Sequence, residues 1–92
     1  MYDEVLTKIF RYFENNIENL PSSRVNNCKK WAISTLLVDI SDNPADDPID
    51  VMSNFILNMV SIASSSEKSK NVFLIAANSV QEVFDYIKGE VK

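Results

Sequence analysis

The chain has 92 residues and a formal net charge of −4. Its length indicates a single domain, and its 46% of apolar residues is too high for a disordered chain. It contains no histidine, which removes the commonest general base near neutral pH and most zinc sites. Its single glycine rules out a glycine-rich phosphate loop, and its one cysteine rules out an intrachain disulfide. The composition therefore predicts a protein that is not an enzyme and has no cofactor.

The first predicted element is a helix over residues 2–20. Apolar residues recur along it at helical spacing, with charged and amide side chains on the opposite face. The apolar stripe consists of Tyr2, Val5, Leu6, Ile9, Phe10, Phe13, Ile17 and Leu20. Asn16 falls within the apolar stripe, where a polar side chain either fixes the packing register or contacts a ligand. Pro21 disfavours helical conformation at the residue before it, so we expect the helix to end there.

The second predicted helix covers residues 23–41, with Ser22 or Ser23 as its N-cap. Residues 31–40 are apolar around nearly the whole circumference, and such a helix is normally surrounded by protein. We therefore expect Trp31 to turn inward. Cys28 has no neighbouring base in the pattern, so it is interpreted as a structural thiol.

An acid-rich turn separates the second and third helices. Residues 39–67 hold six acids and no base, so the negative charge of the protein is concentrated in the middle of the chain. Five of these acids are aspartates that lie close together in the sequence: Asp39, Asp42, Asp46, Asp47 and Asp50. They serve helix capping and solubility, or they form an acidic docking surface that attracts basic partners and repels nucleic acid.

The third predicted helix covers residues 48–63, with Asp46 or Asp47 as its cap and Pro48 near its first position. One face carries mainly serine and asparagine, with Leu57 among them. This face either packs closely on a neighbouring helix or lies against a partner chain. Residues 51–66 carry no charged side chain, but polar residues interrupt this run, so we do not predict a membrane helix.

The fourth predicted helix covers residues 66–89. Its apolar stripe consists of Phe73, Ala76, Ala77, Val80, Val83, Phe84, Ile87 and Val91. Ser64 and Glu67 have the spacing of a capping box, and Gly89 is a candidate C-terminal stop. Four helices with short connections predict an all-α fold, an antiparallel up-down-up-down four-helix bundle that spans residues 1–92. The apolar surplus around Trp31, Val38 and Leu57 exceeds what one bundle buries, and a homodimer or a hetero-complex would cover it.

Two other kinds of site receive little support from the sequence. The aspartates do not follow the EF-hand pattern, because Pro44 interrupts them and no glycine or terminal glutamate follows at the required positions, so no metal site is predicted. Arg24, Lys29 and Lys30 beside Trp31 form only a small basic cluster in an acidic protein, so we predict no nucleic-acid binding. The N-terminal residues lack the pattern of a secretory signal, and with the lone cysteine they predict a cytoplasmic location.

The stretch DNPADDPID carries a resemblance in profile. A short, acidic, helical chain with such a surface is similar to small bacterial immunity and antitoxin proteins, many of which cover the active site of a basic nuclease. The resemblance implies a protein that binds and inhibits a toxin. A structural or assembly subunit that forms a homodimer, and a phage-type regulatory binding protein, are the alternatives. The predicted partner-binding residues are Asp39, Asp42, Asp46, Asp47, Asp50, Asn54, Leu57, Asn58 and Trp31.

Overall fold

The computed structural model describes residues 2–90, which form four helices and no strand. In chain order these are α1 (Tyr2–Asn16), α2 (Arg24–Asp42), α3 (Pro48–Ser65) and α4 (Lys70–Glu90). The predicted all-α four-helix bundle is confirmed. Residues 1, 91 and 92 of the predicted domain lie outside the described residues.

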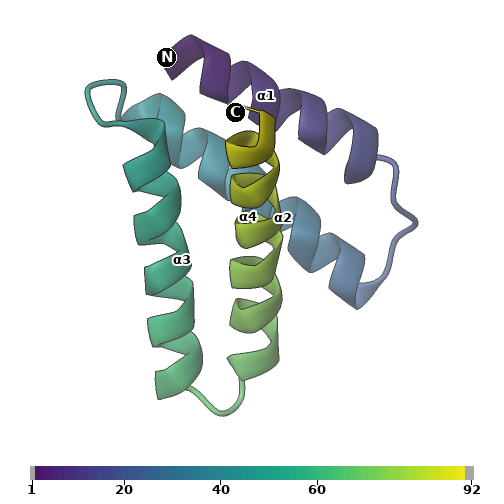
Figure 1. Ribbon diagram of the computed structural model, residues 1–92. Helices are drawn as coiled ribbons and strands as arrows, with labels where there is room; N and C mark the ends of the chain where they lie inside the picture. The colour runs from purple at the N-terminus through teal and green to yellow at the C-terminus, as the bar shows by residue number, and fades with distance from the viewer. Residues whose placement is uncertain (1, 91–92) are drawn as a thin grey trace.

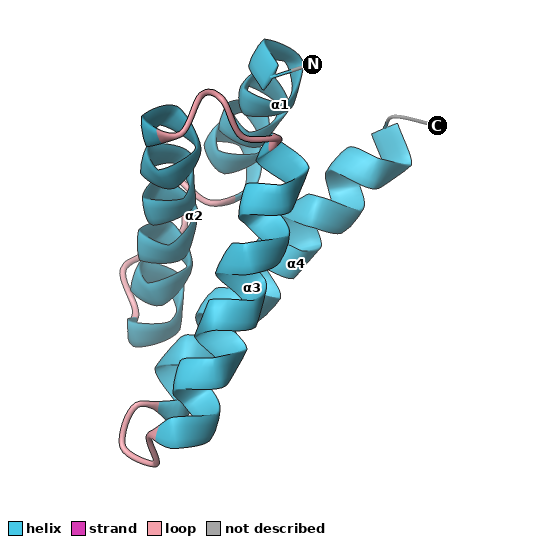
Figure 2. Cartoon of the chain, turned by 90° about the vertical axis from the view of Figure 1, so that its left-hand side faces the viewer, coloured by secondary structure: helices cyan, strands magenta, loops and turns pink. Residues whose placement is uncertain are grey.

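The helices are arranged as two hairpins that cross each other. Figure 1 shows α1 and α2 as one hairpin, and α3 and α4 as a second that runs across it. The contact between α3 and α4 is the most extensive, followed by that between α2 and α4. Figure 1 shows that α2 and α3 diverge from the turn that joins them, and in the side view of Figure 2 α2 lies at one edge of the molecule. The crossing leaves the outer side of α2 without a helix packed on it among the described residues.

All four helices contribute to one core. Its largest fully buried side chains are aliphatic or methionine: Ile9, Ile33, Leu36, Ile40, Met52, Val80, Val83 and Ile87. Val5 and Ile9 come from the stripe predicted for the first helix, and Val80, Val83 and Ile87 from the stripe predicted for the fourth. The helical periodicity of the sequence therefore identified most of the core correctly.

The first helix ends earlier than predicted. α1 stops at Asn16, and a turn follows in which the backbone N–H groups of Ile17 and Glu18 both donate to the Phe13 carbonyl, at 2.9 and 2.8 Å. Asn16 is exposed, and its Nδ2 donates to the Tyr12 carbonyl at 3.2 Å. The interpretation of Asn16 as a residue within the apolar stripe is wrong, because its side chain bonds back to its own helix.

The N-caps of α2 and α3 follow the sequence patterns. The Ser23 hydroxyl accepts a hydrogen bond from the Asn26 N–H at 3.0 Å. The Asp47 carboxylate accepts one from the Ile49 N–H at 2.9 Å, and Pro48 stands at the first position of α3, where its missing N–H leaves no bond unmade. Of the two alternatives given for each cap, Ser23 and Asp47 are the residues used.

The predicted capping box at Ser64 is wrong. α3 continues to Ser65, and α4 begins only at Lys70. The Ser64 hydroxyl donates to the Val60 carbonyl at 3.0 Å, and the Ser65 hydroxyl donates to the Ser61 carbonyl at 3.1 Å. These serines form hydrogen bonds with the helix that they end. A serine hydroxyl can either donate to the carbonyl four residues earlier in its own helix or accept from the N–H of a residue that follows, and here it does the former. Gly89 lies within α4 and does not end it.

Candidate partner-binding surface

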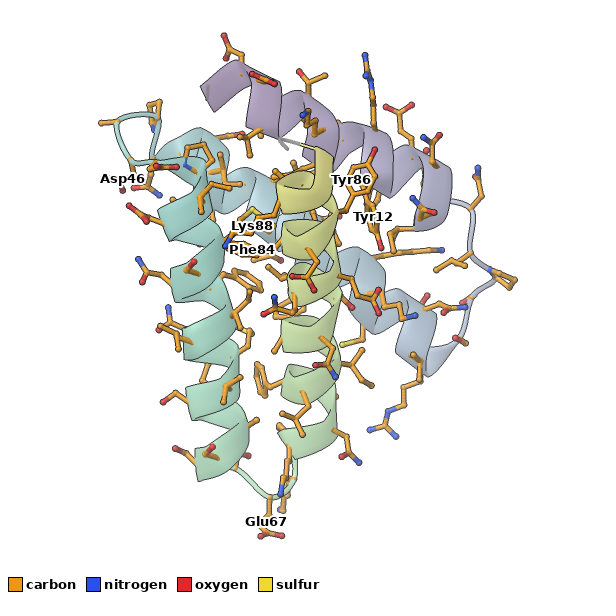
Figure 3. All side chains as sticks on the ribbon, viewed as in Figure 1. Tyr12, Asp46, Glu67, Phe84, Tyr86 and Lys88 are labelled. Carbon is orange, nitrogen blue, oxygen red and sulfur yellow. The ribbon has the colours of Figure 1, made fainter. Side chains whose placement is uncertain are left out.

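The acidic corner consists of Asp39, Asp42, Asp46, Asp47 and Asp50, at the turn between α2 and α3. All five residues are exposed, and the turn stands out at the edge of the molecule beside the label of Asp46 in Figure 3. Among the side chains that the structure describes, those of residues 3–89, the one ion pair joins Lys8 to Glu4 at 3.6 Å, so no cation of this range pairs with these aspartates. Within the described part of the chain, Asp47 is the one member of the corner whose carboxylate accepts a hydrogen bond, at the cap of α3. The described residues therefore leave the negative charge of the corner without a paired cation and exposed to solvent.

Backbone hydrogen bonds hold the turn of the acidic corner in shape. The Asn43 N–H donates to the Ile40 carbonyl at 3.2 Å, and the Asp46 N–H donates to the Asn43 carbonyl at 3.1 Å. The Asn43 side chain adds a bond from Nδ2 to the Asp39 carbonyl at 2.8 Å. These bonds occupy backbone oxygens rather than carboxylates, so four of the five carboxylates are left to solvent within the described chain.

The outer face of α2 is apolar and exposed. Trp31, Val38 and Asp42 are spaced i, i+7 and i+11, which places them on one side of the helix. Trp31 is 45% exposed and Val38 is 59% exposed. The expectation that Trp31 turns inward is therefore wrong, and the described chain does not surround residues 31–40. The reason is the crossing of the hairpins, which packs helices only against the inner face of α2.

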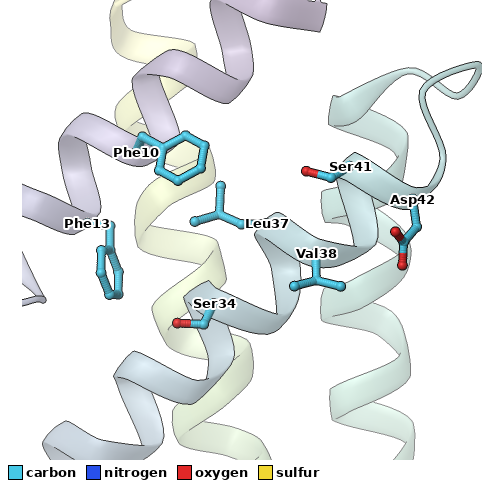
Figure 4. A pocket seen from close by; sticks show the side chains of 7 residues that line it. All are labelled: Phe10, Phe13, Ser34, Leu37, Val38, Ser41 and Asp42. Carbon is cyan, nitrogen blue, oxygen red and sulfur yellow. The ribbon is translucent and has the colours of Figure 1, made fainter.

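An open groove lies between α1 and α2, next to the acidic corner (Figure 4). Its volume is about 410 Å³. Phe10 and Phe13 of α1 face Leu37 and Ser34 of α2 across it, and Asp42 stands at the end nearest the turn. We call this the aromatic groove; it is lined by Phe10, Phe13, Ser34, Leu37, Val38, Ser41 and Asp42.

Sequence reasoning did not find the aromatic groove. It placed Phe10 and Phe13 in the stripe of the first helix. Phe13 is half-buried and packs against the core as well as lining the groove, whereas Phe10 is 46% exposed. The available signal was the apolar surplus of α2, of which Val38 lines the groove. That surplus indicated that apolar side chains of α2 remain exposed. Periodicity on one helix, however, does not reveal which residues of another helix lie beside it.

The outer face of α3 is the second exposed surface that begins at the acidic corner. Asp50, Asn54, Leu57 and Asn58 are all exposed, and Leu57 is 65% exposed. The alternative in which this face packs closely on a neighbouring helix is wrong for the described chain. Trp31 lies on α2 and Leu57 lies on α3, and these two helices diverge from the turn between them (Figure 1). The predicted partner-binding residues therefore fall on α2, on α3 and in the turn that joins them.

The fold changes the ionisation of two side chains with potential for chemistry, Cys28 and Tyr12. The Cys28 thiol is half-buried and donates to the Val72 carbonyl at 3.2 Å, and burial raises its pKa, which lowers the thiolate fraction that a nucleophile requires. Tyr12 packs on Tyr86 with ring centroids 5.3 Å apart. Burial raises the pKa of Tyr12, and the charge of Glu82 and its hydrogen bond with the phenol raise it further. No group of three or more potential metal ligands occurs among residues 2–90.

Comparisons with known proteins found no match: no family model fits the chain, and no curated protein or solved structure is significantly similar to it. Within the described part of the chain, no helix combines the length and the apolar character needed to cross a membrane.

Proposed function

We propose that this protein is a non-enzymatic binding protein that recognises a basic protein partner through the acidic corner. The observation that carries the proposal is the group of five exposed aspartates that pair with no cation among residues 2–90. Concentrated, unpaired negative charge beside exposed apolar side chains is the arrangement expected of a surface that meets a basic partner. In its most concrete form, the protein is an inhibitor of the immunity or antitoxin kind that neutralises a basic toxin.

The proposed mechanism divides the work between charge and apolar contact. The aspartates replace the phosphates of a nucleic-acid substrate on the toxin, and their field speeds the encounter of the two proteins. Exposed apolar side chains next to the corner, such as Val38, are buried in the complex and slow its dissociation. The bonds that fix the turn mean that the corner needs little reorganisation on binding.

The first experiment is co-expression of the tagged chain with the product of the adjacent gene, followed by purification and size determination. The proposal expects a stable one-to-one complex with a basic neighbour that inhibits growth when expressed alone. Failure of such a neighbour to bind, or restoration of growth without binding, contradicts direct inhibition.

The second experiment tests charge steering in that complex. The triple variant Asp42→Asn, Asp46→Asn and Asp47→Asn keeps the fold, because asparagine caps a helix about as well as aspartate. We expect it to associate more slowly and with a flatter salt dependence. The matched control changes Glu14, Glu18 and Glu67 to Gln, which removes the same charge from exposed sites, and Figure 3 shows Glu67 at the opposite end of α3 from Asp46. Equal effects of the two triple variants would contradict recognition at the corner.

A second candidate function is a structural subunit that forms a homodimer. The exposure of Trp31, Val38 and Leu57 supports it, because a second copy would bury these side chains. Sedimentation of the purified chain over a wide concentration range distinguishes the two candidates. A self-associating chain favours the homodimer, and a monomer at every concentration counts against it.

A further inference from the structure

The acidic corner adjoins two exposed apolar surfaces, and the structure points to one of them as the anchor site. We propose that the aromatic groove between α1 and α2 receives an apolar side chain from a cationic amphipathic segment of the partner. In this arrangement, Asp42 at the end of the groove pairs with a lysine or arginine of the same segment. The inference rests on the proposed function and adds the chemistry of the partner.

The shape and lining of the aromatic groove suit an apolar anchor. Two helices contribute its walls, with Phe10 and Phe13 on one side and Leu37 and Val38 on the other (Figure 4). Phe10 and Val38 are 46% and 59% exposed, so each has apolar area left to bury. A side chain that lies in this open groove contacts apolar walls from two helices, and buried apolar anchors provide most of the binding energy at protein interfaces.

The charge at the end of the groove selects a cation. The Asp42 carboxylate has no ion-pair partner among residues 2–90, and Asp39 and Asp46 lie in the same exposed corner. A lysine or arginine placed about one turn from an apolar anchor on the partner's helix would reach Asp42 while the anchor fills the groove. An acidic or neutral segment would leave this carboxylate beside the interface without a counter-charge.

The same charge argues against a second copy of this chain as the occupant. A two-fold dimer places the same surface of both subunits in one interface. A dimer centred on the groove would bring together two acidic corners with five aspartates each, and the segment from residue 39 to 67 contains no base to offset them. The negative charge of the acidic corner attracts a cationic segment of another protein, whereas it repels the acidic corner of a second copy.

The outer face of α3 is less suited to hold an anchor. Leu57 is 65% exposed, but Asn54 and Asn58 flank it on the outside of a single helix. A side chain that contacts Leu57 there remains largely open to water, whereas the groove offers apolar walls from two helices. Leu57 and Val38 are both exposed and apolar, but only Val38 lines the groove. Substitutions at these two positions therefore compare binding inside the groove with binding outside it.

The test uses the full chain, labelled with ¹⁵N, and a synthetic helical peptide of about 18 residues made of leucine and lysine at amphipathic spacing. Two control peptides replace either every lysine by glutamate or every leucine by serine. We expect the Leu–Lys peptide to shift the amide signals of Phe10, Leu37, Val38 and Asp42 at low salt, and both control peptides to bind far more weakly.

The variants separate the groove from the rest of the surface. We expect Val38→Ser and Asp42→Asn each to weaken binding of the Leu–Lys peptide about tenfold. Leu57→Ser, the matched control, is expected to leave the affinity unchanged. Circular dichroism checks that each variant is folded, which the exposure of these side chains favours.

Each outcome of the peptide experiment decides the inference. Signal shifts centred on α3, an unchanged affinity of Val38→Ser, or no binding of the Leu–Lys peptide would overturn the groove as the anchor site. If the triple aspartate variant lost binding of the Leu–Lys peptide while Val38→Ser kept it, recognition by the acidic corner would be supported and the groove as anchor site would be contradicted. Co-expression with the adjacent gene product tests the proposed function separately, so the two failures are distinguishable.

Discussion

The inner and outer faces of α2 carry side chains of similar character in very different surroundings. Ile33, Leu36 and Ile40 on the inner face are fully buried, whereas Trp31 and Val38 on the outer face are 45% and 59% exposed. Both faces come from one short stretch, and hydropathy alone does not distinguish them. The difference arises because the two hairpins cross, which packs α1, α3 and α4 against the inner face and leaves the outer face to solvent (Figure 2).

This contrast shows how an exposed apolar face differs from a core. The inner face stabilises the folded chain by itself, since its side chains are out of contact with water in the monomer. The outer face contributes little to folding and becomes useful only when another molecule covers it. Mutations on the two faces should therefore change different quantities: stability on the inner face, and binding on the outer one.

The largest expected difference is between Leu36→Ala and Val38→Ala. Leu36 is fully buried, so its truncation leaves a cavity and is expected to lower the free energy of unfolding by about 2–5 kcal/mol. Val38 is exposed, and its truncation is expected to change that free energy by less than about 0.5 kcal/mol. Urea denaturation of both variants measures the difference. Similar losses would mean that the outer face is buried in the protein as it exists in solution.

A smaller effect is expected within the acidic corner, where one aspartate supports the fold and its neighbour does not. Asp47→Ala removes the hydrogen bond to the Ile49 N–H at the cap of α3, and we expect a loss of about 1 kcal/mol. Asp46→Ala is the matched control, and its stability should remain close to that of the parent chain. A loss for Asp46→Ala as large as that for Asp47→Ala would show that the corner contributes to folding as a unit.

Tyr12 provides a pH-dependent test at the boundary between buried and exposed regions. Because burial and Glu82 raise the pKa of its phenol above the ordinary value of 10.0, the folded state holds the proton more tightly than the unfolded state. The resulting stabilisation is fully present below pH 10.0 and is lost as the pH rises through the pKa of the folded state. We expect the free energy of unfolding to fall over this range and Tyr12→Phe to remove that part of the decline.

The companion variant Glu82→Gln separates the causes of the Tyr12 pKa. It removes the charge but leaves the burial, which is the largest cause, so the pKa of the phenol should fall only part of the way towards 10.0. Absorbance titration of the tyrosinate follows both variants. A complete return to the ordinary value in Glu82→Gln would show that burial has no effect there.

The smallest effect concerns Cys28, which lies on α2 between its two faces. Burial raises the pKa of the thiol, and the bond to the Val72 carbonyl holds it in place. We expect iodoacetamide to alkylate it several-fold more slowly in the folded chain than in urea at the same pH. Equal rates would indicate that this part of α2 opens freely to solvent.

Local patterns in the sequence predicted much of the fold. Ser23, Asp47 and Pro48 marked the starts of two helices because caps depend on residues only a few positions apart. Errors occurred where two local conformations compete. The Ser64 and Ser65 hydroxyls donate to carbonyls of the helix that they end rather than capping the next helix. The turn after Asn16 begins several residues before Pro21, where the first helix was predicted to end.

The candidate surface was predicted in part. The five aspartates, Leu57 and Trp31 were named from charge and from apolar surplus, and all of them are exposed. The aromatic groove was missed, since Phe10 and Val38 are far apart in the sequence and share a hollow only through the packing of α1 beside α2.

The sequence by itself determined the four helices, two of their caps, most of the core and the concentration of acids between α2 and α3, because each depends on residues close together in the chain. The tertiary structure alone decided which apolar residues remained outside. The crossing of the hairpins buried Leu36, exposed Val38 two residues later, and brought Val38 and Phe10 to the lining of one groove with Asp42 at its end. Helical periodicity specifies the faces of a helix, but only the placement of the other helices decides which face is covered.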